Sequence, residues 1–264
     1  MGSLAATVAS ALRHHELVIA MAQRDLKGFG RGAVLGRVWL VLAPLLQVVA
    51  YVAVVAFVFG RSSDPDGDRW AYILYVLSGM TVWQICARTL QEATTLIRDR
   101  MDLVKQVIYP VETLPVTTLI VSSVGGAVTG CIFLALAAAT GHLGAHMLLL
   151  PVPLLLLAAF LIGASWLLSV AGVLLKDLRD IVSLLLGLSV LVSPVVLAPT
   201  MVSERVWSLV MLNPLAHVVV VFRDVLQGGF HPASWIVFVG LAGGSLLLGA
   251  WVIGRMKVLV NEYL

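Results

Sequence analysis

Side chains that could do chemistry are scarce inside the long apolar stretches of this sequence. Two ionisable residues stand out there, Arg88 and Glu92, and their spacing of four places them on one helix face, where they can pair. A carrier driven by protons or ions would be expected to hold Asp, Glu or His near the middle of a membrane, where these stretches are nearly uncharged. The pattern therefore argues against an ion-coupled transporter.

The sequence lacks the motifs of common nucleotide, catalytic and metal sites. It contains no G-x-x-x-x-G-K-[ST] loop, no H-E-x-x-H and no G-x-S-x-G. Cys86 and Cys131 fit no metal spacing, and the three aspartates of residues 64–68 lack the length and final Glu of a calcium loop. We therefore expect no metal and no cofactor in this chain, and we expect a separate subunit to bind any ATP and Mg²⁺.

A membrane-embedded acyl- or glycosyltransferase stays open as an alternative. Such an enzyme needs carboxylates or histidines at a membrane face. The histidines with some clustering in the sequence are His142, His146, His217 and His231.

The composition explains why ionisable groups are so few. The chain has 264 residues, of which 60% are hydrophobic and only 12% are charged, whereas a soluble domain carries roughly a quarter charged residues. Its mean hydropathy is +1.02. This balance excludes an ordinary soluble enzyme, a disordered protein and a nucleic-acid binder, and it predicts a protein of the lipid bilayer.

The apolar stretches predict an all-α membrane protein with a single transmembrane domain over residues 1–264. A helix needs roughly 20 apolar residues to cross the hydrocarbon core. Six stretches meet this requirement, namely 38–59, 70–91, 114–139, 147–175, 181–201 and 234–254.

Residues 203–229 fit a re-entrant segment better than a seventh span. Asn213-Pro214 interrupts the segment, and Arg223-Asp224 closes its apolar part. Irregular backbone is tolerated at membrane depth only where protein or a water-filled cavity shields it, so the segment suggests a pathway. An amphipathic loop on the outer surface is the alternative.

The basic residues predict the orientation. With six spans and both termini in the cytoplasm, thirteen of the 17 Lys and Arg residues fall on the inner side, as the positive-inside rule requires.

Two amphipathic helices are expected on that inner side. The first covers residues 12–30 and suits the headgroup plane, because Arg13, Arg24 and Lys27 share one stripe of an otherwise apolar helix. The second covers residues 98–110, and its apolar face predicts a helix that docks onto a partner, with a solvated loop as the alternative.

Several short motifs, in this order, carry a family resemblance. They comprise residues 24–27 with Val34-Leu35-Gly36, Trp39 and Pro44, then 107–110 with Leu114-Pro115, then 176–181, 213–215 and 222–224. Together they resemble the permease subunits of ABC transporters that export polysaccharides and polyol phosphates (Wzm/TagG-like).

The resemblance implies a homodimer with a pore between the two copies and two copies of an ATPase subunit, and it places the protein in the bacterial cytoplasmic (inner) membrane. The expected cargo is a lipid-linked polysaccharide of O-antigen, galactan or teichoic-acid type. The alternative is a permease of the same architecture that exports a drug or a lipid. The implied partners also include membrane lipids and exclude nucleic acid.

The same resemblance assigns roles to residues. Coupling to the ATPase falls to Arg98, Asp99, Arg100, Met101, Asp102, Val104, Lys105, Ile108 and Tyr109. The helix that gates the first span carries Arg24, Asp25, Lys27, Arg31 and Arg37. The outer gate carries Asn213, Pro214, Arg223 and Asp224. One departure from the family is the glycine-rich run 28–32, which predicts an unusually flexible hinge.

Aromatic side chains of the first two spans are candidates to line a glycan pathway, because ring faces stack on sugars. The candidates are Tyr51, Phe57, Phe59, Trp70, Tyr72, Tyr75 and Trp83, together with Arg88. Aromatic belts at the membrane interface are the alternative explanation.

Overall fold

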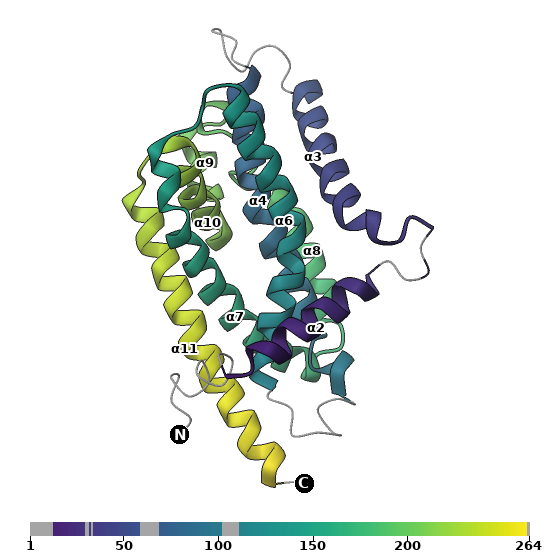
Figure 1. Cartoon of the computed structure of the whole chain (residues 1–264). Helices are drawn as coiled ribbons and strands as arrows, with labels where there is room; N and C mark the ends of the chain where they lie inside the picture. Colours follow the sequence, from purple (N-terminus) through teal and green to yellow (C-terminus); the bar gives the residue numbers. More distant parts are fainter. Residues whose placement is uncertain (1–12, 30–31, 33, 59–68, 102–110, 263–264) are drawn as a thin grey trace.

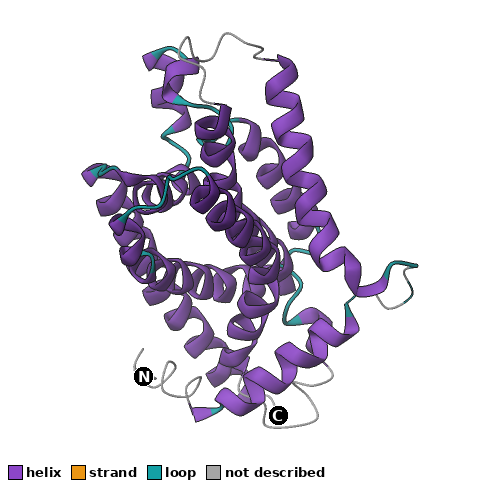
Figure 2. Ribbon diagram, turned by 45° about the horizontal axis from the view of Figure 1, so that its top comes forward, coloured by secondary structure: helices purple, strands orange, loops and turns teal. Residues whose placement is uncertain are grey.

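The regular structure of this protein is helical throughout the part that is described. The computed structural model describes residues 13–29, 32, 34–58, 69–101 and 111–262, and every regular element in these ranges is a helix. Its long helices run alongside one another as a bundle (Figures 1 and 2). They are α3 (Trp39–Val58), α4 (Arg69–Ala93), α6 (Leu114–Ala139), α7 (Pro151–Leu174) and α11 (Pro232–Glu262). The predicted all-α fold class is confirmed.

Proline marks the start of several helices. Pro115 lies in the first turn of α6, and Pro151 and Pro232 begin α7 and α11. Proline is favoured there because its missing N–H would have no intrahelical partner, and its φ angle already suits a helix. These residues therefore set the point at which each apolar stretch begins to coil.

Four helical stretches are long and apolar enough to cross a membrane. They are Trp70–Ala93, Val111–Ala139, Ala145–Leu174 and Pro232–Arg255, and they coincide with the expected spans 70–91, 114–139, 147–175 and 234–254. The first expected span, 38–59, corresponds to α3, a helix of 20 residues.

The fifth expected span is not one continuous helix. The prediction covered residues 181–201, whereas α8 (Leu178–Leu191) ends ten residues earlier and a short 3₁₀ helix, η6 (Pro199–Met201), follows. Pro194 explains the break, because in a continuing helix its ring would clash with the carbonyl of Val190. Pro also pushes Ser193 away from the helical region.

A sharply bent pair of helices follows α8. Helix α9 (Glu204–Val210) is joined to α10 (Pro214–Arg223), which continues into one π-helical turn, η7 (Asp224–Gly228). The two parts meet at 103°. We call residues 204–228 the bent segment.

Helix α4 is the most enclosed of the four helices that are long enough to cross a membrane. In its most apolar window 61% of the residues are buried, against 28% for α6, α7 and α11. Met80 of α4 lies in the main core with Phe133, Leu161 and Phe222. The outward faces of the surrounding helices carry large apolar side chains, such as Leu155 and Ile236, both 73% exposed, as lipid contact would allow.

Glycine brings α7 and α11 into close contact. A Cβ atom at Gly163 would collide with the backbone of Ser245, and one at Gly249 would collide with the carbonyl oxygen of Gly163. Small residues commonly permit this close approach of helices in membranes.

The amphipathic helix α2 (His15–Gly28) lies across one end of the bundle, within the predicted range 12–30. Its Val18, Met21 and Ala22 are buried, and Met21 packs with Leu96 and Leu114. Helix α11 ends at the same end of the bundle (Figure 1). We call this the α2 end.

Candidate functional site

An ion pair joins α2 to the start of the predicted coupling helix. Arg100 lies in a 3₁₀ turn, η3 (Arg98–Arg100), and its Nη2 lies 2.5 Å from Asp25 Oδ2 of α2. The two residues are 75 positions apart in the chain. The predicted gate helix α2 and the start of the predicted coupling helix are therefore in direct contact.

The remaining residues of these two predicted sets are only partly described. Arg98 and Asp99 are exposed in η3, and Met101 follows them at the edge of the described range. On the gate side, Arg24, Lys27 and Arg37 are exposed. Outside the described residues lie Arg31, Asp102, Val104, Lys105, Ile108 and Tyr109.

Arg88 and Glu92 form the ion pair that their spacing predicts. Arg88 Nε lies 3.0 Å from Glu92 Oε1. The guanidinium carbon of Arg88 also lies 4.7 Å from the ring centroid of Phe29, beyond the end of α2, which is a cation–π contact. The end of α4 is thus linked to the end of α2.

The candidate pathway aromatics occupy different environments. Tyr51 is half-buried against the main core, Trp83 is buried within it, and Trp70 is 50% exposed. The backbone of Phe57 lies in α3, while Phe59 lies outside the described residues.

Tyr72 and Tyr75 connect α4 to the chain after α8. The hydroxyl of Tyr72 donates to the carbonyl oxygen of Val196 at 3.2 Å, and that of Tyr75 donates to the carbonyl oxygen of Leu197 at 2.8 Å. Because the helix is broken at Pro194, the carbonyl oxygens of this segment need hydrogen-bond donors from elsewhere. The two phenols supply them.

Asn213 and Pro214 shape the turn of the bent segment. Asn213 Oδ1 accepts the backbone N–H of Leu215 at 3.0 Å, which caps α10, and Pro214 is its first residue. The amide nitrogen of Asn213 also donates to Ser189 Oγ of α8 at 2.6 Å. The tip of the bent segment is therefore held against α8.

Arg223 is enclosed at the far end of α10. Its Nη2 donates to the carbonyl oxygen of Pro194 at 2.7 Å and to that of Tyr75 at 3.2 Å. Its guanidinium carbon lies 3.4 Å from the Tyr75 ring centroid. This side chain therefore fastens α10 to α4 and to the break after α8.

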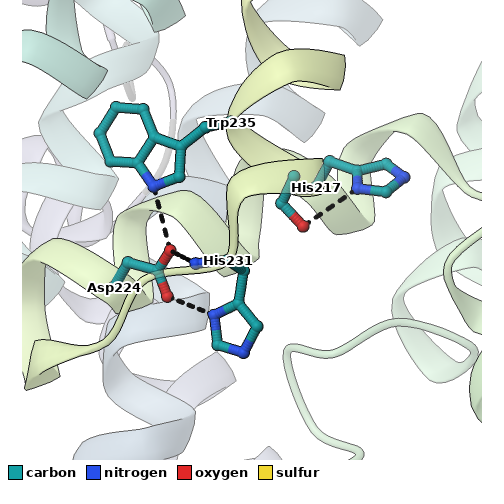
Figure 3. A network of polar contacts seen from close by, with 5 residues as sticks. His217, Asp224, His231 and Trp235 are labelled. Carbon is teal, nitrogen blue, oxygen red and sulfur yellow. Dashed lines mark hydrogen bonds and ion pairs between the residues drawn. The ribbon is translucent and has the colours of Figure 1, made fainter.

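Asp224 organises a second network, drawn in Figure 3. Its Oδ2 accepts the backbone N–H of His231 at 2.8 Å and Trp235 Nε1 at 3.0 Å, while Oδ1 lies 2.6 Å from His231 Nδ1. The side chain of Asp224 is only 3% exposed. Three contacts thus tie the bent segment to the start of α11.

Three of the four histidines considered for a membrane enzyme have separate hydrogen-bond partners. His217 Nδ1 lies 3.2 Å from Ser234 Oγ, His231 contacts Asp224, and His142 Nδ1 lies 2.9 Å from Thr140 Oγ1. His146 lies beside Gly228, and its buried Nε2 has no hydrogen-bond partner within the described part of the chain. Among the described residues, no group of three or more His, Cys, Asp or Glu side chains could hold a metal ion.

Sequence reasoning missed several residues of these networks. Ser189, Trp235 and the carbonyls of Pro194, Val196 and Leu197 received no role, although each contacts a residue that did. Pro194 gave the one usable signal, because a proline inside an apparent span predicts a break and exposed carbonyls.

Comparison with known proteins identifies the family of the chain. A family model described as ABC-2 type transporter matches residues 16–226. The O-antigen export system permease protein RfbA of Myxococcus xanthus is 27% identical over 216 residues, covering 81% of each chain. A protein of the same name from Klebsiella pneumoniae is 22% identical over 252 residues, covering 94% of this chain and 95% of the relative. The chain belongs to the membrane-protein family of ABC-2 type transporters.

Proposed function

We propose that this multi-pass membrane protein is the pore-forming permease of a bacterial ABC exporter. Its cargo is a lipid-linked polysaccharide, of O-antigen, galactan or teichoic-acid type, and a separate ATPase subunit provides the energy. The observation that carries the proposal is the family match over residues 16–226, together with relatives named as O-antigen export permeases that align along most of the chain.

The proposed topology has six spans, with both termini on the cytoplasmic side of the inner membrane. Two of these spans are α3 and α8, the latter with the broken chain that follows it. The bent segment then enters from the outer side and returns to it. Two contacts support this path. η7 contacts η5 (Ala145–Leu149) at the end of the bundle opposite α2. Asn213 contacts α8.

In this topology the α2 end meets the ATPase. Residues 98–110 form the coupling element, and the Asp25–Arg100 ion pair passes its movement to the gate helix α2. Two copies of the permease and two of the ATPase complete the transporter. Exposed apolar residues along α8, such as Leu184 and Leu188, support a face that is covered by lipid or by the second copy.

The pathway for the glycan lies between the two copies. Trp70 and Tyr51 keep exposed surface and remain its aromatic candidates, whereas Tyr72 and Tyr75 act by holding the segment after α8 in place. Asn213, Pro214, Arg223 and Asp224 position the outer gate rather than contact the cargo.

Deleting the gene in its source bacterium tests the transport role. We expect the surface polysaccharide to disappear and lipid-linked polysaccharide to accumulate inside the cell, with both effects reversed by the intact gene. Unchanged surface polysaccharide would contradict the proposed cargo and favour a drug or lipid exporter.

Affinity purification tests the ATPase partner separately. We expect the tagged protein to bring down a subunit with a P-loop, and Arg98→Glu to reduce that association several-fold, since reversing an interface charge leaves like charges facing each other. Arg13→Glu makes the same change at an exposed site of the α2 region, outside the coupling element. Equal association of both variants would refute the coupling role of η3.

A further inference from the structure

A polar cavity of about 370 Å³ lies at the α2 end, where four separate segments meet. Helix α2 and the residue after it contribute Arg24, Asp25 and Phe29, η3 contributes Arg100, and the end of α4 contributes Arg88 and Glu92. Thr118 and Val121 of α6 line a further side, and the cavity is open to the surface. A volume of this size falls in the range of small-ligand sites.

The cavity carries an excess of positive charge. Two of its three arginines are matched by carboxylates, in the pairs Arg100–Asp25 and Arg88–Glu92. Arg24 is the third; it is exposed and forms no ion pair with any described residue. In addition, Arg100 Nη1 is buried and has no hydrogen-bond acceptor within the described part of the chain. A buried donor of this kind is costly unless a ligand satisfies it.

The position of the cavity restricts the kind of anion it would take. It lies where the apolar window of α4 gives way to charged residues, beneath an amphipathic helix that exposes Leu17 and Ile19. Such helices lie in the headgroup plane of a membrane. The ring of Phe29 adds an apolar wall under Arg88. An anion that combines phosphate with a hydrocarbon neighbour matches these surroundings.

We propose that this cavity binds the phosphate or diphosphate headgroup of a membrane lipid, with Arg24 and Arg100 as its ligands. Guanidinium groups suit this role because their paired N–H groups match phosphate oxygens. Since Arg100 also holds Asp25, the headgroup contacts the ion pair that joins α2 to the coupling element. The proposal rests on the inner-side placement of α2 in the proposed function, but not on the identity of the cargo.

Binding measurements on the purified full-length protein in neutral detergent test this site. The probes are farnesyl diphosphate, dioctanoyl phosphatidylglycerol and inorganic diphosphate, with uncharged farnesol as the blank. We expect Arg24→Gln to weaken binding of the phosphate-bearing amphiphiles by about tenfold, the loss of one charge-assisted contact. Arg13→Gln removes the same charge from an exposed site outside the cavity, and should leave affinity within about twofold.

A second variant is expected to tighten binding, an effect that simple loss of folding could not produce. Glu92→Gln removes a carboxylate from the cavity, so it should tighten binding of the same amphiphiles several-fold. Equal affinities of the Arg24→Gln and Arg13→Gln proteins would overturn the site, as would weaker binding by Glu92→Gln or binding of farnesol as tight as that of its diphosphate.

The probes also separate the two sources of the headgroup. Tighter binding of farnesyl diphosphate than of phosphatidylglycerol assigns the site to a diphosphate carrier lipid, and equal binding assigns it to bulk phospholipid. Inorganic diphosphate that binds as tightly as the amphiphiles would refute a lipid ligand. The gene deletion tests the export function, and the binding measurements test the cavity. Failure of one proposal can therefore be distinguished from failure of the other.

Discussion

The two ends of the bundle hold their charges in different ways. At the α2 end the ion pairs are partly open to solvent, with side chains 27% and 42% exposed in Arg88–Glu92 and 18% and 30% in Arg100–Asp25. At the bent segment Asp224 is 3% exposed, although its partner His231 is 67% exposed, and Arg223 is held by two carbonyls and an aromatic ring. The first arrangement can exchange partners at little cost, whereas the second cannot.

This difference separates architecture from function. Breaking a buried charged network leaves uncompensated polar groups, which costs several kcal/mol, while an exposed ion pair contributes about 1 kcal/mol or less. We therefore infer that the charges of the bent segment hold it against α4 and α11, and that those of the α2 end serve partners and ligands. Substitutions at the two ends should differ accordingly.

The largest loss of stability is expected from Asp224→Ala. It removes the acceptor of three hydrogen bonds and leaves the indole N–H of Trp235 and the backbone N–H of His231 without that acceptor, while the exposed imidazole of His231 can turn to water. The free energy of unfolding should therefore fall by about 2 kcal/mol. Thermal unfolding in detergent measures the effect. Asp180→Ala removes an exposed carboxylate and should change stability by less than about 0.5 kcal/mol. Equal effects of the two variants would contradict the comparison.

How much of this could be predicted from the sequence depends on the range of each interaction. Long helices are predictable because crossing a bilayer requires about 20 apolar residues, and α6 begins and ends where expected, at Leu114 and Ala139. The Arg88–Glu92 pair is likewise predictable, since a spacing of four places both residues on one helix face.

Contacts between distant segments could not be predicted in this way. Arg223 and the carbonyl of Tyr75 are 148 positions apart, and Arg100 and Asp25 are 75 apart. Hydrophobic periodicity describes one helix at a time and carries no information on which helices pack together. The adjacent charges Arg223 and Asp224 illustrate the limit, because they look like one feature in the sequence and serve two separate networks in the fold.

A smaller loss is expected from Tyr75→Phe. The change deletes the hydroxyl that donates to Leu197 at 2.8 Å but keeps the ring beneath Arg223, so about 1 kcal/mol of stability should be lost. Tyr72→Phe deletes a longer bond, of 3.2 Å, and should cost less. Tyr75→Leu removes ring and hydroxyl together and should cost more than either. If Tyr75→Phe proves as stable as the parent protein, the phenol does not hold the segment after α8.

The smallest effect on stability, and the most informative for function, is expected at the Asp25–Arg100 pair. Asp25→Arg or Arg100→Asp alone places like charges opposite each other, and the double variant restores a pair of opposite charges in reversed order. Each single change should cost no more than about 1 kcal/mol of stability, because the pair is partly exposed. Both should nevertheless weaken association with the ATPase subunit, and the double variant should recover it, since the coupling energy belongs to the contact and not to either residue. Single variants that retain full association would show that α2 and the coupling element act independently, and the α2 end would then lose the role that distinguishes it from the bent segment.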